Sequence, residues 1–228
     1  MYLVSLYFDE KTNKTIQNHI NKVAEKTGNT FMIDGNVPPH ITVSAFETKC
    51  EEACVTMLEN IVTQIETGCL QWASVGTFLP YVIYIAPVLN NYLQGMIETI
   101  YDRIQTVPET KMSPYYKPFG WLPHTTIGKK LTKQEMQIAF EVMQTQFRVL
   151  EGTVTKIGLA KTNPYQEIKI WKLKRIDENI GPICLFMERI DKKLRHFFWR
   201  FLHPMFEPVD YNLFQCCGTS NSLITLKR

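Results

Sequence analysis

Apolar residues recur at two spacings along the first 173 residues of this 228-residue chain. Short runs rich in aliphatic and aromatic residues predict strands, and apolar positions three and four apart predict helices. The expected strands are 1–8, 40–46, 69–79, 81–88, 124–131, 150–160 and 166–173. The expected helices are 15–28, 51–68, 90–107 and 132–147. The order strand, helix, strand, helix, strand is therefore nearly duplicated along the chain.

Each half contains one strand that opens with Pro-His-x-Thr. The first is "PPHITVSAF", with His40 and Thr42, and the second is "LPHTTIGKKL", with His124 and Thr126. Residues two apart in a strand point to the same face, so each histidine is expected to share a face with its threonine.

A pair of such motifs suits the chemistry of phosphate esters. The unperturbed pKa of histidine, about 6.5, lets the side chain take or give a proton near neutrality. Opening a cyclic phosphate needs a base to activate water and an acid to protonate the leaving ribose oxygen. A threonine hydroxyl can hydrogen-bond the non-bridging phosphate oxygens. This arrangement requires no cofactor or metal, and the six cysteines show no zinc-site spacing.

Over roughly residues 1–173, the two motifs resemble those of the 2H phosphoesterases, also called 2'-5' RNA ligase-like proteins. The resemblance implies an α+β fold: two pseudo-symmetric lobes of antiparallel sheet, with helices outside, around a central groove. We expect lobes of about 1–78 and 79–173, followed by a C-terminal extension over 174–228. The implied activity is hydrolysis or reversible formation of 2',3'-cyclic phosphate, 2'-5' phosphodiester or cyclic-nucleotide linkages.

The implied substrates are an RNA end, a 2'-5' oligonucleotide or a cyclic nucleotide. By the same resemblance, we expect His124 to act as the base and His40 as the acid. Many members carry arginine after the second motif, where this chain has Lys129 and Lys130. Lysine still binds phosphate as a point charge, so Lys129 is a candidate substrate-binding residue.

The aromatic loop before the second motif, "SPYYKPFGWLP", offers faces on which a nucleobase could stack. Tyr116 and Trp121 are the candidates for this contact, and the alternative is a loop whose aromatic residues cover the core.

Charge is unevenly distributed behind a net value of +3. Residues 1–80 carry 5 basic and 9 acidic side chains, and residues 81–173 carry 11 and 7. The basic second half would suit an anionic substrate. No apolar run reaches the roughly 18 residues of a membrane span, and the first residues do not resemble a signal peptide. We therefore expect a cytoplasmic protein.

Residues 183–203 place apolar side chains along one predicted helical stripe and basic ones opposite. Such a helix can lie on a membrane surface, pack on its own domain or bind a protein partner. Two alternatives to an enzyme follow: a non-catalytic module that binds RNA or a nucleotide, and a scaffold that attaches to a membrane or partner through this helix.

Overall fold

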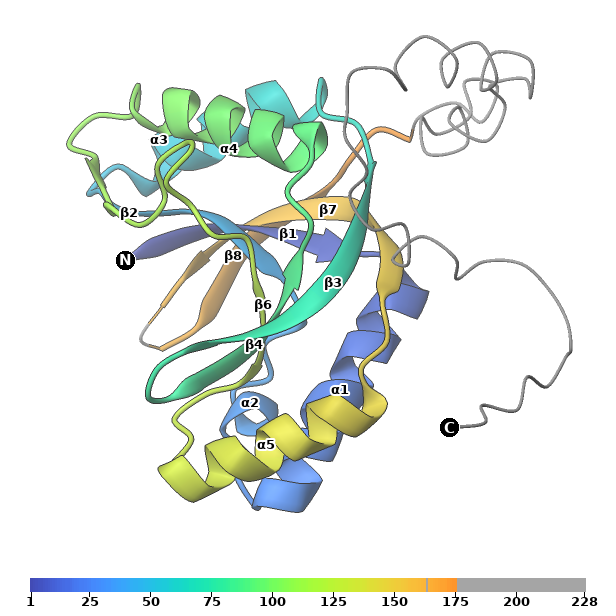
Figure 1. The fold of residues 1–228 in the computed structure, drawn as a ribbon. Coiled ribbons are helices and arrows are strands. Elements are labelled where there is room, and N and C mark those ends of the chain that lie inside the picture. The colour runs from blue at the N-terminus through green and yellow to red at the C-terminus, as the bar shows by residue number, and fades with distance from the viewer. Residues whose placement is uncertain (163, 176–228) are drawn as a thin grey trace, which may run out of the picture. The chain divides into compact units, whose positions relative to one another are not determined.

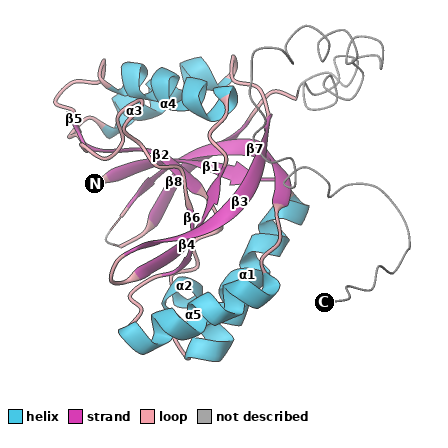
Figure 2. Cartoon of the chain, viewed as in Figure 1, coloured by secondary structure: helices cyan, strands magenta, loops and turns pink. Residues whose placement is uncertain are grey.

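The computed structural model describes residues 1–162 and 164–175, which form eight strands and five helices (Figures 1 and 2). The strands are β1 (Tyr2–Phe8), β2 (Ile41–Glu47), β3 (Gly68–Phe78), β4 (Val82–Pro87), β5 (Lys111–Met112), β6 (Thr125–Gly128), β7 (Leu150–Lys161) and β8 (Gln166–Lys172). The helices are α1 (Glu10–Thr27), α2 (Phe31–Asp34), α3 (Glu51–Val62), α4 (Asn91–Ile104) and α5 (Lys133–Gln146). All the elements expected within this part are present, and the short α2 and β5 are additional.

The strands join in one antiparallel sheet with the order β5-β2-β1-β7-β3-β4-β6, and β8 pairs with β7. The long strand β7 joins the two parts of the sheet, because it pairs with β1 on one edge and with β3 and β8 on the other. This architecture confirms the α+β class expected from the sequence. The expected boundary between lobes falls in the turn between β3 and β4, and the division of the chain into lobes stays a prediction.

Local signals set several helix ends. The side chain of Asp9 accepts a hydrogen bond from the backbone N–H of Thr12 and caps α1, which ends at Gly28 with φ 75°. Asn90 caps α4 in the same way, and Thr132 opens α5 with a capping box. These residues satisfy backbone donors that the first helical turn leaves without partners.

Helices cover one face of the sheet. α3 and α4 contact β8 and β2, whereas α1 and α5 contact β6, β4 and β7 (Figure 1). Between helices and sheet lies one apolar core, which includes fully buried Leu6, Trp72, Ile83 and Ile97. The opposite face of the sheet, called here the inner face, carries the two motif threonines Thr42 and Thr126.

The extension 174–228 and its expected helix over 183–203 lie almost wholly outside the described residues. No helix in the described part is long and apolar enough to cross a membrane. The expected cytoplasmic location stays a prediction.

Candidate active site

Both motif histidines lie immediately before a strand, where the chain leaves a proline. His40 precedes β2 and His124 precedes β6. The ring nitrogen Nδ1 of His40 lies 2.8 Å from the carbonyl oxygen of Pro38, and Nδ1 of His124 lies 2.9 Å from that of Leu122. A carbonyl oxygen can only accept, so Nδ1 carries the proton in each ring and Nε2 keeps a lone pair. The two histidines are therefore fixed in the same tautomer by the same local contact.

The threonines lie on the inner face through strand register. Thr42 is paired with Ser5 of β1, and their hydroxyl oxygens are 3.5 Å apart. Thr126 is paired with Tyr84 of β4. Its neighbour Thr125 faces the helices instead, where its hydroxyl accepts a hydrogen bond from the buried indole of Trp72 at 3.2 Å. The motif's second threonine is thus the one left on the inner face.

Aromatic rings that the sequence analysis did not select lie against both histidines. The ring centroid of Tyr7 is 6.2 Å from that of His40, and Tyr84 lies 5.4 Å from His124. Phe78 meets His124 edge-on, with centroids 4.8 Å apart. The sequence signal that points to Tyr7 is the period-two alternation of a strand, which puts Tyr7 on the same face of β1 as Ser5.

Two glycines make room for these tyrosines. A Cβ atom at Gly158 of β7 would stand 2.8 Å from Cε2 of Tyr7. One at Gly76 of β3 would stand 2.6 Å from Cζ of Tyr84. Each tyrosine ring therefore crosses a glycine in the neighbouring strand. The two motifs are built alike although they belong to different parts of the sheet.

Burial and charge favour the neutral form of both histidines. The pKa of His40 is lowered by burial and further by the charges of His124 and Lys129, against the raising effect of the Pro38 carbonyl. Burial also lowers the pKa of His124, against the carbonyl of Leu122. The influence of His124 and Lys129 on His40 places all three in one electrostatic environment. The structure thus brings together the predicted catalytic histidines and Lys129.

The aromatic loop packs on the first motif. Trp121 is 8% exposed, and its Nε1 donates to the carbonyl oxygen of Thr42 at 3.2 Å. Tyr116 is half-buried. Burial raises its pKa, against the smaller lowering effect of a hydrogen bond with the Thr42 side chain. These placements favour a positioning role for both residues, and their expected stacking on a base stays a prediction. The exposed faces in this loop belong to Tyr115 and Phe119.

In the part of the chain that the structure describes, no three or more His, Cys, Asp or Glu residues are grouped so as to hold a metal ion. The residues that could hold an anion here are the two threonines and Lys129, whose exposed side chain follows β6.

Comparison with known proteins gives the family. Two solved structures with this fold are LigT of E. coli in complex with 3'-AMP and TT0787 of Thermus thermophilus, each with a TM-score of 0.51 and 13% sequence identity. The first match covers 75% of this chain and 97% of LigT, and the second covers 76% and 98%. The sequence matches no curated protein. The family model described as the 2'-5' RNA ligase superfamily matches residues 13–166. The chain therefore belongs to the 2'-5' RNA ligase superfamily, as the two Pro-His-x-Thr motifs led us to expect.

Proposed function

We propose that the chain is a metal-independent phosphoesterase that acts on a 2',3'-cyclic phosphate or 2'-5' phosphodiester of a nucleotide or RNA, with His40 and His124 as its acid-base pair. The observation that carries this proposal is the shared geometry of the histidines, each with Nδ1–H on a carbonyl and Nε2 available. The complex of LigT with 3'-AMP supports a nucleotide as the substrate class.

The proposed reaction starts with one proton on the pair. Neutral His124 accepts a proton from water at Nε2 while the water oxygen bonds to phosphorus. The bond from phosphorus to one ribose oxygen breaks, and the imidazolium of His40 donates its Nε2 proton to that oxygen. The proton removed from water ends on His124, and the ribose hydroxyl takes the proton from His40. In the reverse reaction, the two histidines exchange roles.

Charge on the phosphate increases at the non-bridging oxygens during attack. The hydroxyls of Thr42 and Thr126 donate hydrogen bonds to these oxygens, and Lys129 adds a positive charge. A bound phosphate anion also opposes the burial that lowers the histidine pKa values, so substrate favours the protonated acid.

The test is an assay of purified protein with 2',3'-cyclic nucleotides, RNA with a cyclic end and 2'-5' oligoadenylate, with and without EDTA. Release of product from at least one substrate should persist in EDTA. Because a positioned acid or base contributes about 10²–10⁴-fold, His40→Ala and His124→Ala should each lower kcat by at least about 100-fold.

The matched control is His19→Ala, which removes a partly buried histidine of α1 that lies 6.2 Å from the ring of Phe147. It should leave kcat within about twofold of the wild type, because it lies outside the motifs. Activity that disappears with EDTA, or that survives loss of either motif histidine, would contradict the mechanism. Binding of substrate without any turnover would favour the non-catalytic module.

A further inference from the structure

Lys156 and Lys172 lie in a row of side chains that starts beside His40 and crosses neighbouring strands. Lys156 of β7 is paired with Tyr7 of β1 on one side and with Lys172 of β8 on the other. Directly paired residues of antiparallel strands point to the same face, so both lysines share the inner face with Tyr7. Tyr7 contacts the ring of His40. The row therefore leads from His40 across three neighbouring strands.

The lysines on the other face of the same two strands provide a contrast. Lys161 lies 2.5 Å from Glu51, and Lys169 forms an ion pair with Glu59, both glutamates belonging to α3. Within residues 1–162 and 164–175, neither Lys156 nor Lys172 forms an ion pair.

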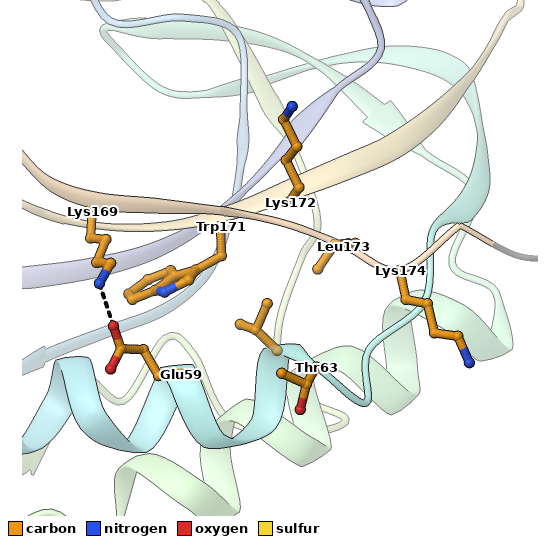
Figure 3. A pocket seen from close by; sticks show the side chains of 8 residues that line it. Glu59, Thr63, Lys169, Trp171, Lys172, Leu173 and Lys174 are labelled. Atoms are coloured by element: carbon orange, nitrogen blue, oxygen red, sulfur yellow. Dashed lines mark hydrogen bonds and ion pairs between the residues drawn. The ribbon is translucent and has the colours of Figure 1, made fainter.

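Figure 3 shows the separation of the two faces at β8. Trp171 and Leu173 point into a pocket of about 580 Å³ against α3, and Lys169 reaches Glu59 there. Lys172 borders this pocket, but its ammonium group points to the opposite side of the strand (Figure 3). The face toward α3 thus has matched charges, and the inner face at this point has two positive charges directly opposite each other. Like charges in such a pair destabilise a sheet unless an anion lies between them.

Glu167, a carboxylate on this face, does not supply that anion. Glu167 lies opposite Ala160 at the other end of β8 and acts electrostatically on Tyr7. Glu167 and Lys172 are five positions apart, which is about 17 Å along a strand. Both lysines are exposed, and in the described part of the chain their ammonium groups are free to bind an anionic ligand.

The sheet spacing defines what kind of ligand reaches both places. Adjacent strands are about 4.8 Å apart, so the backbone at Lys156 lies about 10 Å from that at His40, and Lys172 about 14 Å. The two lysines therefore lie two and three strands to the side of the position proposed for the reacting phosphate. A neighbouring phosphate of the same polynucleotide strand can meet them, and lysine binds phosphate as a point charge.

We propose that Lys156 and Lys172 bind a second phosphate of the substrate, so that this enzyme acts on oligonucleotides in preference to mononucleotides. This inference rests on the proposed function, because it takes the reacting phosphate to lie at His40 and His124. The ligand is single-stranded nucleic acid that extends from the histidines over β1 and β7 toward β8.

The test compares two substrates that share the reacting group. One is a 2',3'-cyclic mononucleotide, and the other is a short RNA that ends in the same cyclic phosphate. The double variant Lys156→Ala, Lys172→Ala should lower kcat/KM for the RNA at least fivefold more than for the mononucleotide, mainly through KM. Its log(kcat/KM) for RNA should fall less steeply with log salt, by about 0.7 for each phosphate that the lysines no longer neutralise.

The charge-matched control is Lys11→Ala, Lys174→Ala. Lys11 is exposed on α1, and Lys174, just beyond β8, lines the pocket (Figure 3). This control should change both substrates by the same factor. A parallel binding measurement uses fluorescein-labelled oligouridine and fluorescence anisotropy, which requires no turnover.

The outcomes separate the two proposals. Equal losses on both substrates, or an unchanged RNA rate with unchanged oligouridine affinity, would overturn the role of the lysine pair. If neither a cyclic phosphate nor 2'-5' oligoadenylate is hydrolysed, the proposed function fails. Weaker oligouridine binding by the lysine variant alone would then still support the second phosphate site, and unchanged binding would overturn it.

Discussion

Replacing Gly158 by alanine should disturb His40 through a single side chain. The new Cβ atom would stand 2.8 Å from Cε2 of Tyr7 and 3.0 Å from Cγ1 of Ile170. Carbon atoms pack best at about 3.5–4.0 Å, so the tyrosine ring has to retreat by about 1 Å. Tyr7 is only 6% exposed, and its ring already contacts His40. The Tyr7 ring therefore has little free space into which it can move.

The expected loss follows from this overpacking. An extra methyl group in a filled site costs about 1–3 kcal/mol of unfolding free energy, which lowers Tm by about 2–4 °C per kcal/mol in a chain of this size. A misplacement of about 1 Å at a catalytic group can cost up to about 100-fold in rate. We expect Gly158→Ala to lower both the free energy of unfolding, measured in urea, and kcat/KM for a 2',3'-cyclic mononucleotide.

The matched control makes the same change in α4. Gly95 has no atom within 4 Å of the position that a Cβ would take, apart from its own helix and its two neighbours. Gly95→Ala should therefore stabilise the protein by about 0.4–1 kcal/mol and leave kcat/KM unchanged. If Gly158→Ala has the stability and the activity of the wild type, the packing of Tyr7 between Gly158 and His40 is not as described.

Three further predictions concern the same region and its support. Both histidines have pKa values below 6.5, so kcat/KM for a 2',3'-cyclic mononucleotide should rise as pH falls from 7, peak below pH 6.5 and then fall as the base is also protonated. A maximum above pH 7 would contradict the stated directions for His40 and His124. Trp121→Phe should cost about 1–3 kcal/mol in urea denaturation, because the carbonyl of Thr42 loses its indole donor; an unchanged midpoint would exclude this role. Asp9→Ala removes the N-cap of α1, which is worth about 0.5–2 kcal/mol, and also the acceptor of the Thr153 backbone N–H, so it should cost at least that much in the same assay; Asp9→Ser should recover only the capping part.

Local sequence patterns predicted where the motif histidines and threonines lie on their strands. Pro38 and Pro39 interrupt the chain before β2, and Pro123 does so before β6, so each histidine could be assigned to the start of a strand. Strand alternation then placed the threonine two residues away on a common face. β5 escaped prediction because its two residues become a strand only by pairing with Phe46 and Glu47 of β2.

The rest of the site depends on contacts between distant parts of the chain. Tyr7 and Tyr84 have the pattern of ordinary strand residues, and only the pairing of β1 with β2 and of β4 with β6 brings them to the histidines. Trp121 lies in a Pro- and aromatic-rich segment, in which the sequence does not distinguish a buried aromatic residue from an exposed one. Its burial results from docking on Thr42, 79 positions earlier. Local spacing can assign Tyr7 to a face of β1, but it does not indicate which motif residue any of these three side chains contacts.

The central position of β7 has a consequence for when the two motifs come together during folding. Four strands separate β2 from β6 in the sheet, so a flat sheet would hold the two motifs about 24 Å apart. The sheet must curve for His40 and His124 to act on each other. β7, which joins β1 to β3, follows both motifs in the chain. A growing chain that already carries both histidines therefore cannot assemble the proposed acid-base pair until residues 150–161 join the sheet. Such non-local pairing forms slowly, so we expect the proposed activity to appear only after β7 has paired with β1 and β3.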